Sequence, residues 1–298
     1  MTATPLSPSG EARARLTVLI LAKNEEGCIA RAVQSVAFAD EVLILDSGST
    51  DRTVEIAEGL GARVVHQDWL GWGKQHRRGV ELATHDWLLS IDSDEIVTPQ
   101  LAASIQAALA AGPDPRNGYV VDRQDEFLGR LMPSMRRRSK RMNFIRLFNR
   151  RFGNWDPTML VHEEIRVPGA ALMLDGPLLH WRNYSISAQM QTLDRNSDLE
   201  GRMLSEAGKA SALMLFLKPL LRFGWIYIVS GCWKLGPRGF IWAGLHASGE
   251  FLRQAKAWER QHVTPMPDPP ASVYAAPDAP PPAPAPARRP AATEPVRT

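Results

Sequence analysis

The sequence predicts an α/β protein built on an open, mostly parallel β-sheet with helices on its faces. Short apolar runs of strand length alternate with amphipathic stretches of helix length along roughly the first third of the chain. Continuous apolar runs are typical of strands buried on both faces, and strand–helix alternation is typical of parallel sheets. The chain has 298 residues, of which 44% are hydrophobic and 22% charged. That composition supports a real core and excludes fibrous and wholly disordered classes.

Four strands, and the helix signals between them, can be placed from residue types. The strands are expected at residues 16–21, 42–45, 62–65 and 87–91. Asn24 can cap the helix after the first strand, with two acidic residues in its first turn. Gly61 can end the next helix in a left-handed conformation. Thr98 followed by Pro99 predicts a helix start, with the threonine as cap.

The chain divides into four parts. Residues 1–15 are expected to be a flexible N-terminus, and residues 16–184 the α/β domain, with further strands near 119–121 and 144–148. Residues 185–262 read as an amphipathic helical region. The last 36 residues hold twelve Pro and nine Ala, a composition that cannot bury enough apolar area to fold. We therefore expect residues 263–298 to be a disordered tail.

Charge and cysteine usage narrow the class of protein. Residues 136–151 carry eight Lys and Arg and no acid, although the net charge is only +3. A local basic patch favours an anionic ligand or surface over nucleic acid, and a solvated charged face is the alternative. The two cysteines form no CxxC pair, so neither a disulfide framework nor a zinc site is expected. The N-terminus shows no apolar signal segment, and the longest uncharged apolar run, 223–233, is short for a membrane span, so we expect a cytoplasmic protein.

Acidic side chains follow three of the predicted strands. Glu25 follows the first strand, Asp46 ends the second, and Asp92 and Asp94 follow the fourth. Ligands of open parallel sheets bind beyond the carboxyl ends of the strands, so these residues should meet at one edge. Two carboxylates two positions apart can hold Mg²⁺ or Mn²⁺ on a diphosphate, although a bare Asp-x-Asp also occurs in surface turns. Asp46 can contact a base or ribose, or cap its own turn.

Several segments closely resemble glycosyltransferase family 2, and more closely its lipopolysaccharide-core branch of the β-1,4-glucosyltransferase type. The resemblance covers about residues 16–255, with the motifs in the order of the family. The segments that carry it are Leu19–Glu25, Val42–Thr53, Gln67–Trp69, Gly71–Gln75, Trp87–Glu95, Arg146–Arg151 and Val161–Glu163.

The resemblance implies a GT-A fold, a nucleotide-diphosphate sugar donor such as UDP-glucose, a divalent cation and inversion at the anomeric carbon. Residues 16–118 would bind the nucleotide and residues 119–184 the acceptor. Asp92 and Asp94 would hold Mg²⁺ or Mn²⁺. The nucleotide-sugar contacts implied by position are Ala22, Lys23, Asn24, Glu25, Asp46, Lys74, Gln75, Asp92 and Ser93. For Lys23, Asn24 and Glu25, capping of the following helix is the alternative role.

Glu163 falls where the family has its general base, the carboxylate that takes a proton from the acceptor hydroxyl. The neighbouring Glu164 is a competitor for this role. His162 would orient an acceptor oxygen or serve a structural hydrogen bond. The basic cluster, with Arg136, Arg137 and Arg138, would bind a phosphorylated or acidic acceptor.

The helical region has the composition of a membrane-interface element. Residues 207–249 contain five Lys and Arg, no acid and several Trp among many apolar residues. A lipid-linked glycan acceptor, such as the inner core of lipopolysaccharide, would place the enzyme at the cytoplasmic face of the inner membrane. Packing of these residues against the catalytic domain or a second subunit is the alternative.

Other functions fit the sequence less well. Asp92-x-Asp94 also resembles the nucleophile motif of haloacid-dehalogenase phosphatases, but that motif follows a first strand rather than a fourth. A sugar-1-phosphate nucleotidyltransferase would need a glycine-rich first loop, which is absent here. A non-catalytic, membrane-associated nucleotide-sugar binder is a third alternative. Departures from the family at His76–Arg77 and residues 234–239 affect the expected sugar and acceptor rather than the reaction class.

Overall fold

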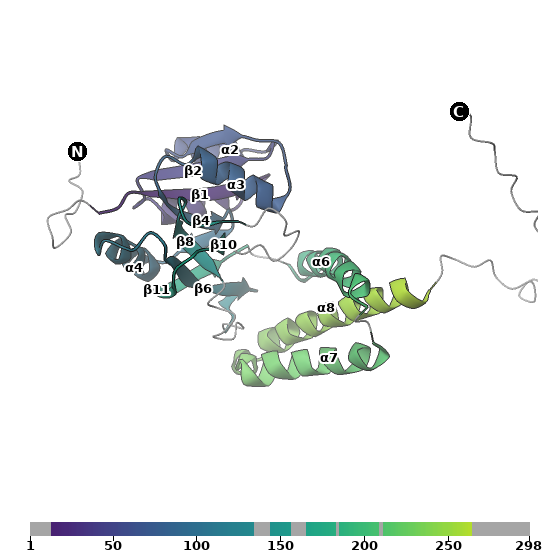
Figure 1. Cartoon of the computed structure of the whole chain (residues 1–298). Helices are drawn as coiled ribbons and strands as arrows, with labels where there is room; N and C mark the ends of the chain where they lie inside the picture. Colours follow the sequence, from purple (N-terminus) through teal and green to yellow (C-terminus); the bar gives the residue numbers. More distant parts are fainter. Residues whose placement is uncertain (1–12, 134–143, 156–164, 183–184, 209–210, 264–298) are drawn as a thin grey trace, which may run out of the picture.

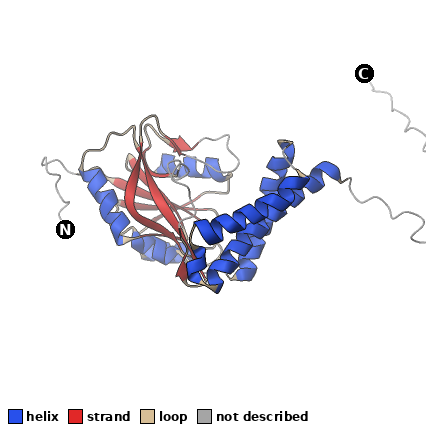
Figure 2. Cartoon of the chain, turned by 90° about the horizontal axis from the view of Figure 1, so that it is seen from below, coloured by secondary structure: helices blue, strands red, loops and turns tan. Residues whose placement is uncertain are grey.

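The computed structural model describes residues 13–133, 144–155, 165–182, 185–208 and 211–263. A curled sheet covered by short helices forms the N-terminal part, and three long helices extend from one end of it (Figures 1 and 2). The sheet order is β3-β2-β1-β4-β8-β6-β11-β5. The strand bounds are β1 Leu16–Ala22, β2 Glu41–Asp46, β3 Arg63–His66, β4 Trp87–Asp92, β5 Glu95–Val97, β6 Gly118–Phe127, β8 Ile145–Asn149 and β11 Ala171–His180.

The sheet has a parallel half and a mixed half. Strands β3, β2, β1 and β4 are parallel neighbours, as the alternation of strand and helix predicts. β8 runs antiparallel to both β4 and β6, while β6 and β11 are parallel. A short strand β7 (Arg130–Leu131) pairs with β6, and β9 (Asn154–Trp155) pairs with β10 (Ile165–Arg166) in a separate sheet. The predicted α/β class is confirmed.

Strand β1 explains why the first apolar run is continuous rather than alternating. Val18 and Ile20 pack into one hydrophobic cluster with residues of α1 (Ile29–Ser35) and α4 (Pro99–Ala110). Leu19 packs into the cluster on the other face, with Val80 of α3 (Trp72–Leu82). All three strand residues are fully buried, because helices cover both faces of the sheet.

Capping residues in the sequence predicted the ends of two helices correctly and of one helix incorrectly. The Thr98 side chain accepts a hydrogen bond from the Leu101 amide at 3.3 Å, with Pro99 at the first helical position. Gly61, at φ +83°, follows α2 (Thr53–Gly59). The expected Asn24 cap is wrong, because α1 begins only at Ile29 and has no side-chain cap. Asn24 lies in the left-handed region instead, at φ 56°, and its Oδ1 accepts from the Thr50 amide at 2.7 Å.

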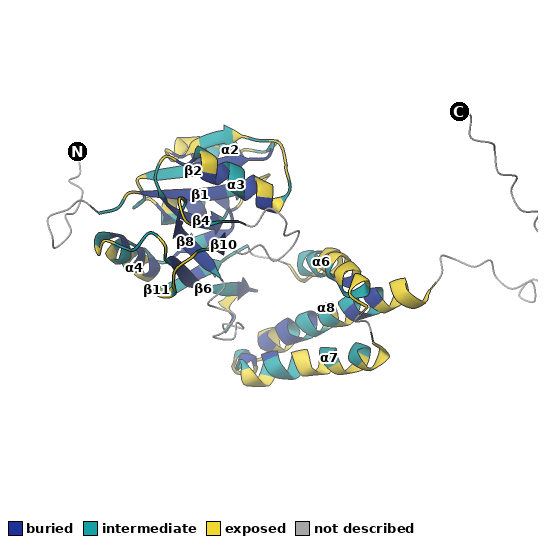
Figure 3. Cartoon of the chain, viewed as in Figure 1, coloured by how far each residue is buried: buried dark blue, intermediate teal, exposed yellow. Residues whose placement is uncertain are grey.

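The C-terminal helices form a packed group. They are α6 Ile186–Glu206, α7 Ala212–Gly224 with its π-helical continuation Trp225–Val229, a 3₁₀ turn at Cys232–Leu235, and α8 Pro237–His262. α8 contacts both α6 and α7. Trp242 of α8 packs against Phe127 at the end of β6, with ring centroids 5.0 Å apart, and this contact joins the helices to the sheet. The outer surface of α7 remains exposed (Figure 3).

The 3₁₀ turn approaches the start of α8 so closely that only glycine fits at position 239. A Cβ there would lie 1.8 Å from the carbonyl oxygen of Cys232, which is backbone and cannot rotate away. Gly239→Ala should lower the free energy of unfolding by about 1–3 kcal/mol through overpacking. Gly244→Ala on the same helix meets nothing within 4 Å and should raise it by about 0.5–1 kcal/mol. Denaturant titration of both variants measures the contrast, and shifts of equal sign would contradict it.

Candidate active site

The carboxyl ends of β1, β2 and β4 lie side by side. In the sheet register, Ala22 pairs with Asp46, and Leu21 pairs with Asp92. Asp94 follows in the turn before β5, and its main-chain oxygen accepts from the Trp181 amide at 2.9 Å. Asp46, Asp92 and Asp94 are therefore at one edge of the fold, as the strand pattern predicts.

Asp46 organises the turn that follows β2. It is 4% exposed, and its carboxylate accepts from the amides of Gly48, at 2.9 Å, and Ser49, at 3.0 Å. The turn-capping role that the sequence left open is thus present. The Asn24 amide donates to the Ser49 hydroxyl at 2.9 Å, so the loops after β1 and β2 form one polar rim.

A buried ion network fixes Asp92. Glu95 is completely buried, and its Oε2 accepts from the Asp92 amide at 2.9 Å. Its Oε1 lies 3.0 Å from Nε of Arg123 and 3.2 Å from Nη2 of Arg146. The same Nη2 lies 3.4 Å from Oδ2 of Asp92. Burial alone would raise the pKa of Asp92, but the two guanidinium groups outweigh it and hold the pKa below its usual range.

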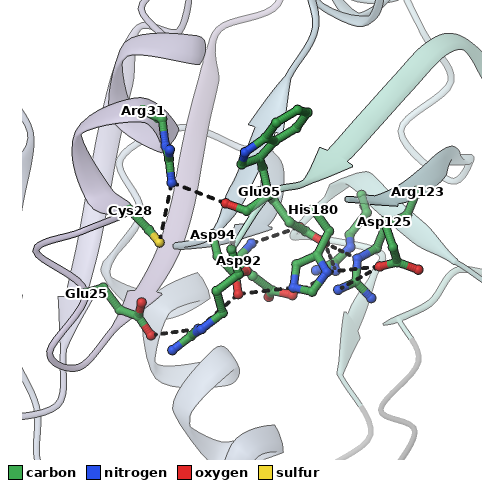
Figure 4. Close-up of polar contacts among 12 residues, drawn as sticks. Glu25, Cys28, Arg31, Asp92, Asp94, Glu95, Arg123, Asp125 and His180 are labelled. Carbon is green, nitrogen blue, oxygen red and sulfur yellow. Dashed lines mark hydrogen bonds and ion pairs between the residues drawn. The ribbon is translucent and has the colours of Figure 1, made fainter. Parts of the chain in front are cut away.

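A second network fixes Asp94 (Figure 4). Its Oδ2 accepts from Nε2 of His180 at 3.1 Å and from Nη1 of Arg182 at 2.9 Å. Nδ1 of His180 contacts Oδ1 of Asp125 at 2.9 Å, and Arg182 also reaches Glu25 at 3.1 Å. Burial would lower the pKa of His180, but the two carboxylates raise it to about 9. The imidazolium therefore persists at neutral pH and donates to both aspartates.

The residues at this edge fit a hard divalent cation with few protein ligands. Among the residues that the structure describes, no group of three or more His, Cys, Asp or Glu is arranged as a metal site. The Asp92 side chain is 44% exposed, whereas that of Asp94 is 8% exposed and its cation contacts fall on Oδ2. Magnesium is commonly bound through one or two carboxylates plus substrate phosphates and water. Asp92 and Asp94 match that pattern of carboxylate ligands.

The other residues predicted to contact the donor differ in how far they are exposed to solvent. Gln75 is fully buried, and its side chain joins the 67–70 loop to the Asp46 turn: Nε2 donates to the Ser47 hydroxyl at 3.0 Å and Oε1 accepts from the Leu70 amide at 3.2 Å. Lys23 and Lys74 are exposed, and Ala22 and Ser93 are buried. The acceptor-side predictions Glu163, Glu164, His162, Arg136, Arg137 and Arg138 lie outside the described residues.

The cations of both networks were missed by sequence reasoning. Arg146 stood in a family-like segment without a role, and Arg123 lies in the middle of a long strand. His180 is the last residue of β11, a ten-residue strand that was not predicted, and Arg182 lies two residues beyond it. The apolar residues just before His180 in the sequence could have predicted a further strand that ends there.

A curled sheet whose carboxyl edge carries an Asp-x-Asp motif is the arrangement expected of a glycosyltransferase of GT-A-like fold. Residues 17–163 match the family model described as Glycosyl transferase family 2. These residues therefore form a domain similar to glycosyltransferase family 2. The family match favours glycosyl transfer over the phosphatase, nucleotidyltransferase and non-catalytic alternatives.

Relatives support the same classification. The chain is 29% identical to the lipopolysaccharide core biosynthesis glycosyltransferase LpsC of Rhizobium meliloti, over 85% of this chain and 95% of that protein. It is also 29% identical to an uncharacterised glycosyltransferase of Rickettsia typhi, over 82% and 87% of the two chains. The solved mannosyltransferase PcManGT of Pyrobaculum calidifontis shares the fold, with a TM-score of 0.51, 13% identity and coverage of 88% and 92%.

The raised pKa of His180 predicts a loss of stability at alkaline pH. Its pKa rises from 6.5 to about 9 on folding, so its contribution is complete below pH 6.5 and disappears as the pH rises through 9. His180→Gln should flatten the decline of the unfolding temperature between those two pH values. His262→Gln, at the exposed end of α8, is the matched control and should keep the wild-type slope. A His180→Gln profile parallel to wild type would contradict the prediction.

Proposed function

We propose that the protein is an inverting hexosyltransferase that moves a sugar from a nucleotide-diphosphate donor, UDP-glucose being the first candidate, to a lipid-linked glycan such as the lipopolysaccharide inner core. The observation that carries the proposal is the meeting of Asp46, Asp92 and Asp94 at one sheet edge. The similarity to a lipopolysaccharide core glycosyltransferase supports the acceptor class. The fold relative PcManGT was solved with GDP-Man and Mn²⁺, which supports the donor and metal class.

The donor would lie along the polar rim with its nucleoside near Asp46 and its diphosphate near Asp92. Asp92 and Asp94 would hold Mg²⁺ or Mn²⁺. When bound, the cation offsets the charge that develops on the leaving diphosphate. Arg146 beside the Asp92 carboxylate and His180 beside the Asp94 carboxylate would keep both groups in place before the donor arrives.

The acceptor side of the reaction rests on residues predicted from the sequence. Glu163 would take the proton from the attacking hydroxyl, with Glu164 as the competing candidate. His162 would orient an acceptor oxygen. Arg136, Arg137 and Arg138 would bind phosphate or carboxylate groups of the acceptor.

The exposed face of α7 and its π-helical continuation supports attachment to a lipid surface. Residues 212–229 are long and apolar enough to cross a membrane by length and composition, with mean hydropathy 1.6 and 6% of the segment buried. In the sequence this segment does not stand out as one apolar run, because Lys218 and Arg222 interrupt it. Large apolar side chains are exposed on this segment: Leu213, Phe216, Leu217, Leu220, Leu221, Ile228 and Val229.

An interfacial position suits this segment better than a transmembrane one. Its other side packs against α8, and α8 is fixed to the end of β6 by the contact between Trp242 and Phe127. Lys218 and Arg222 provide the cations that favour an anionic membrane surface. We place the protein peripherally at the cytoplasmic face of the inner membrane.

Donor binding tests the proposed function. A panel of nucleotide sugars, with and without Mn²⁺ or Mg²⁺, should include one that stabilises the protein by about 2.7 kcal/mol at 100 times its Kd. Asp92→Asn should lose the metal-dependent part of that shift. Asp175→Asn, an exposed aspartate on β11, is the control and should keep it. The proposal fails if no donor of the panel stabilises the wild type with either metal.

The same assay separates binding from chemistry. Glu163→Gln should keep donor stabilisation and lose about 100- to 10,000-fold in transfer rate, the usual contribution of a general base. Glu164→Gln is the paired variant and should retain transfer. The reverse result would assign the base to Glu164.

The exposed α7 face predicts binding to anionic vesicles. Phe216 and Leu220 are 70% and 71% exposed, and replacing both with Ser should weaken vesicle binding at least about tenfold, because burial of each side chain contributes about 1.5–3 kcal/mol. Phe152→Ser, at an exposed position beyond β8, should leave binding unchanged. Sedimentation with vesicles containing anionic lipid measures the effect. Equal binding of all three proteins would remove the membrane assignment.

A further inference from the structure

Arg146 occupies an unusual position at the metal-binding edge. It lies on β8, which runs antiparallel to β4, so the beginning of β8 reaches the carboxyl end of β4 where Asp92 lies. Its Nη2 contacts Oδ2 of Asp92 at 3.4 Å and Oε1 of Glu95 at 3.2 Å. The more open of the two proposed metal ligands therefore already has a cation beside it.

The guanidinium group is only partly used by these contacts. Arg146 is 8% exposed, and the ring of Phe144 lies 4.2 Å from its central carbon, which fixes the plane of the group. Its buried Nε has no hydrogen-bond partner among the described residues, and both carboxylate contacts fall on Nη2. A buried donor without a partner is costly, and arginine binds phosphate through two nitrogen atoms at once.

The charges around the Arg146 guanidinium group determine which ligands it favours. A divalent cation on Asp92 would come close to the Arg146 guanidinium, and the two positive charges would repel each other in a partly buried site. Arrival of a diphosphate with the cation removes that repulsion and brings oxygen acceptors to the guanidinium group. Arg146 thus opposes the metal alone and favours the metal together with the diphosphate.

We propose that Arg146 is a ligand of the donor diphosphate and that it makes metal binding at Asp92 depend on that diphosphate. The inference rests on the proposed donor site and names a residue that recognises the leaving group. Its consequence is a coupling between two ligands, since each should raise the affinity of the other by the same factor.

Mn²⁺ binding measured by electron paramagnetic resonance tests the coupling without any turnover. The wild type should bind Mn²⁺ weakly alone and about 5- to 150-fold more tightly with saturating UDP or GDP, the usual range of coupling between two sites. Arg146→Gln should bind Mn²⁺ alone more tightly than wild type, yet gain little from the nucleoside diphosphate. Binding of UMP or GMP, which lack the second phosphate, should change little.

Two further variants keep the test decisive. Arg151→Gln removes the same charge from an exposed position beyond the other end of β8 and should behave as wild type. Arg146→Lys keeps the cation beside Asp92 and Glu95, so it should restore weak binding of Mn²⁺ alone and part of the coupling, even if the glutamine variant folds poorly.

The outcomes separate this inference from the proposed function. A wild type that binds no nucleoside diphosphate with Mn²⁺ would overturn both. A wild type with strong coupling that Arg146→Gln and Arg146→Lys leave intact would overturn the role of Arg146 alone. A purely structural role of Arg146 would give a different result. Arg146→Gln would then loosen the site and weaken Mn²⁺ binding in the absence of nucleotide rather than strengthen it.

Discussion

Mutual repulsion among carboxylates is the constraint on which this site depends. Five acidic side chains gather at the carboxyl edge of the sheet, two of them buried and three partly buried. They are Glu25, Asp92, Asp94, Glu95 and Asp125. Such a cluster is tolerable only when cations are interleaved with it, and Arg123, Arg146, His180 and Arg182 provide them. Buried ion pairs contribute little net stability, so the main effect of the arrangement is to fix where each carboxylate lies.

The two halves of the sheet supply different residues of the site. The parallel half brings Asp46 and Asp92 to one edge through its regular register. The mixed half supplies the cations, from β6, from the start of β8 and from the end of β11. A wholly parallel sheet would present the amino end of no strand at this edge, and Arg146 reaches Asp92 because β8 runs the other way.

The sequence was sufficient for features that depend on neighbouring residues. The strand ends at Asp46 and Asp92 and the Thr98 cap follow from apolar runs and turn residues that lie next to each other in the chain. The cation partners could not be predicted in the same way, because Arg146 is 54 residues and His180 is 86 residues from the aspartate each contacts. Asn24 failed for a related reason: its side chain bonds to Thr50, in the loop after the next strand, instead of to its own helix.

Strand β6 connects the acidic edge of the sheet to the C-terminal helices. It carries Arg123 and Asp125 of the ion networks, and two residues later Phe127, which packs on Trp242 of α8. α8 in turn holds α7. If α7 rests on a lipid surface, the height of the acidic edge above that surface is set by packed side chains rather than by a flexible tether. The distance of an acceptor hydroxyl from the bilayer would then limit which lipid-linked glycans reach the acidic edge.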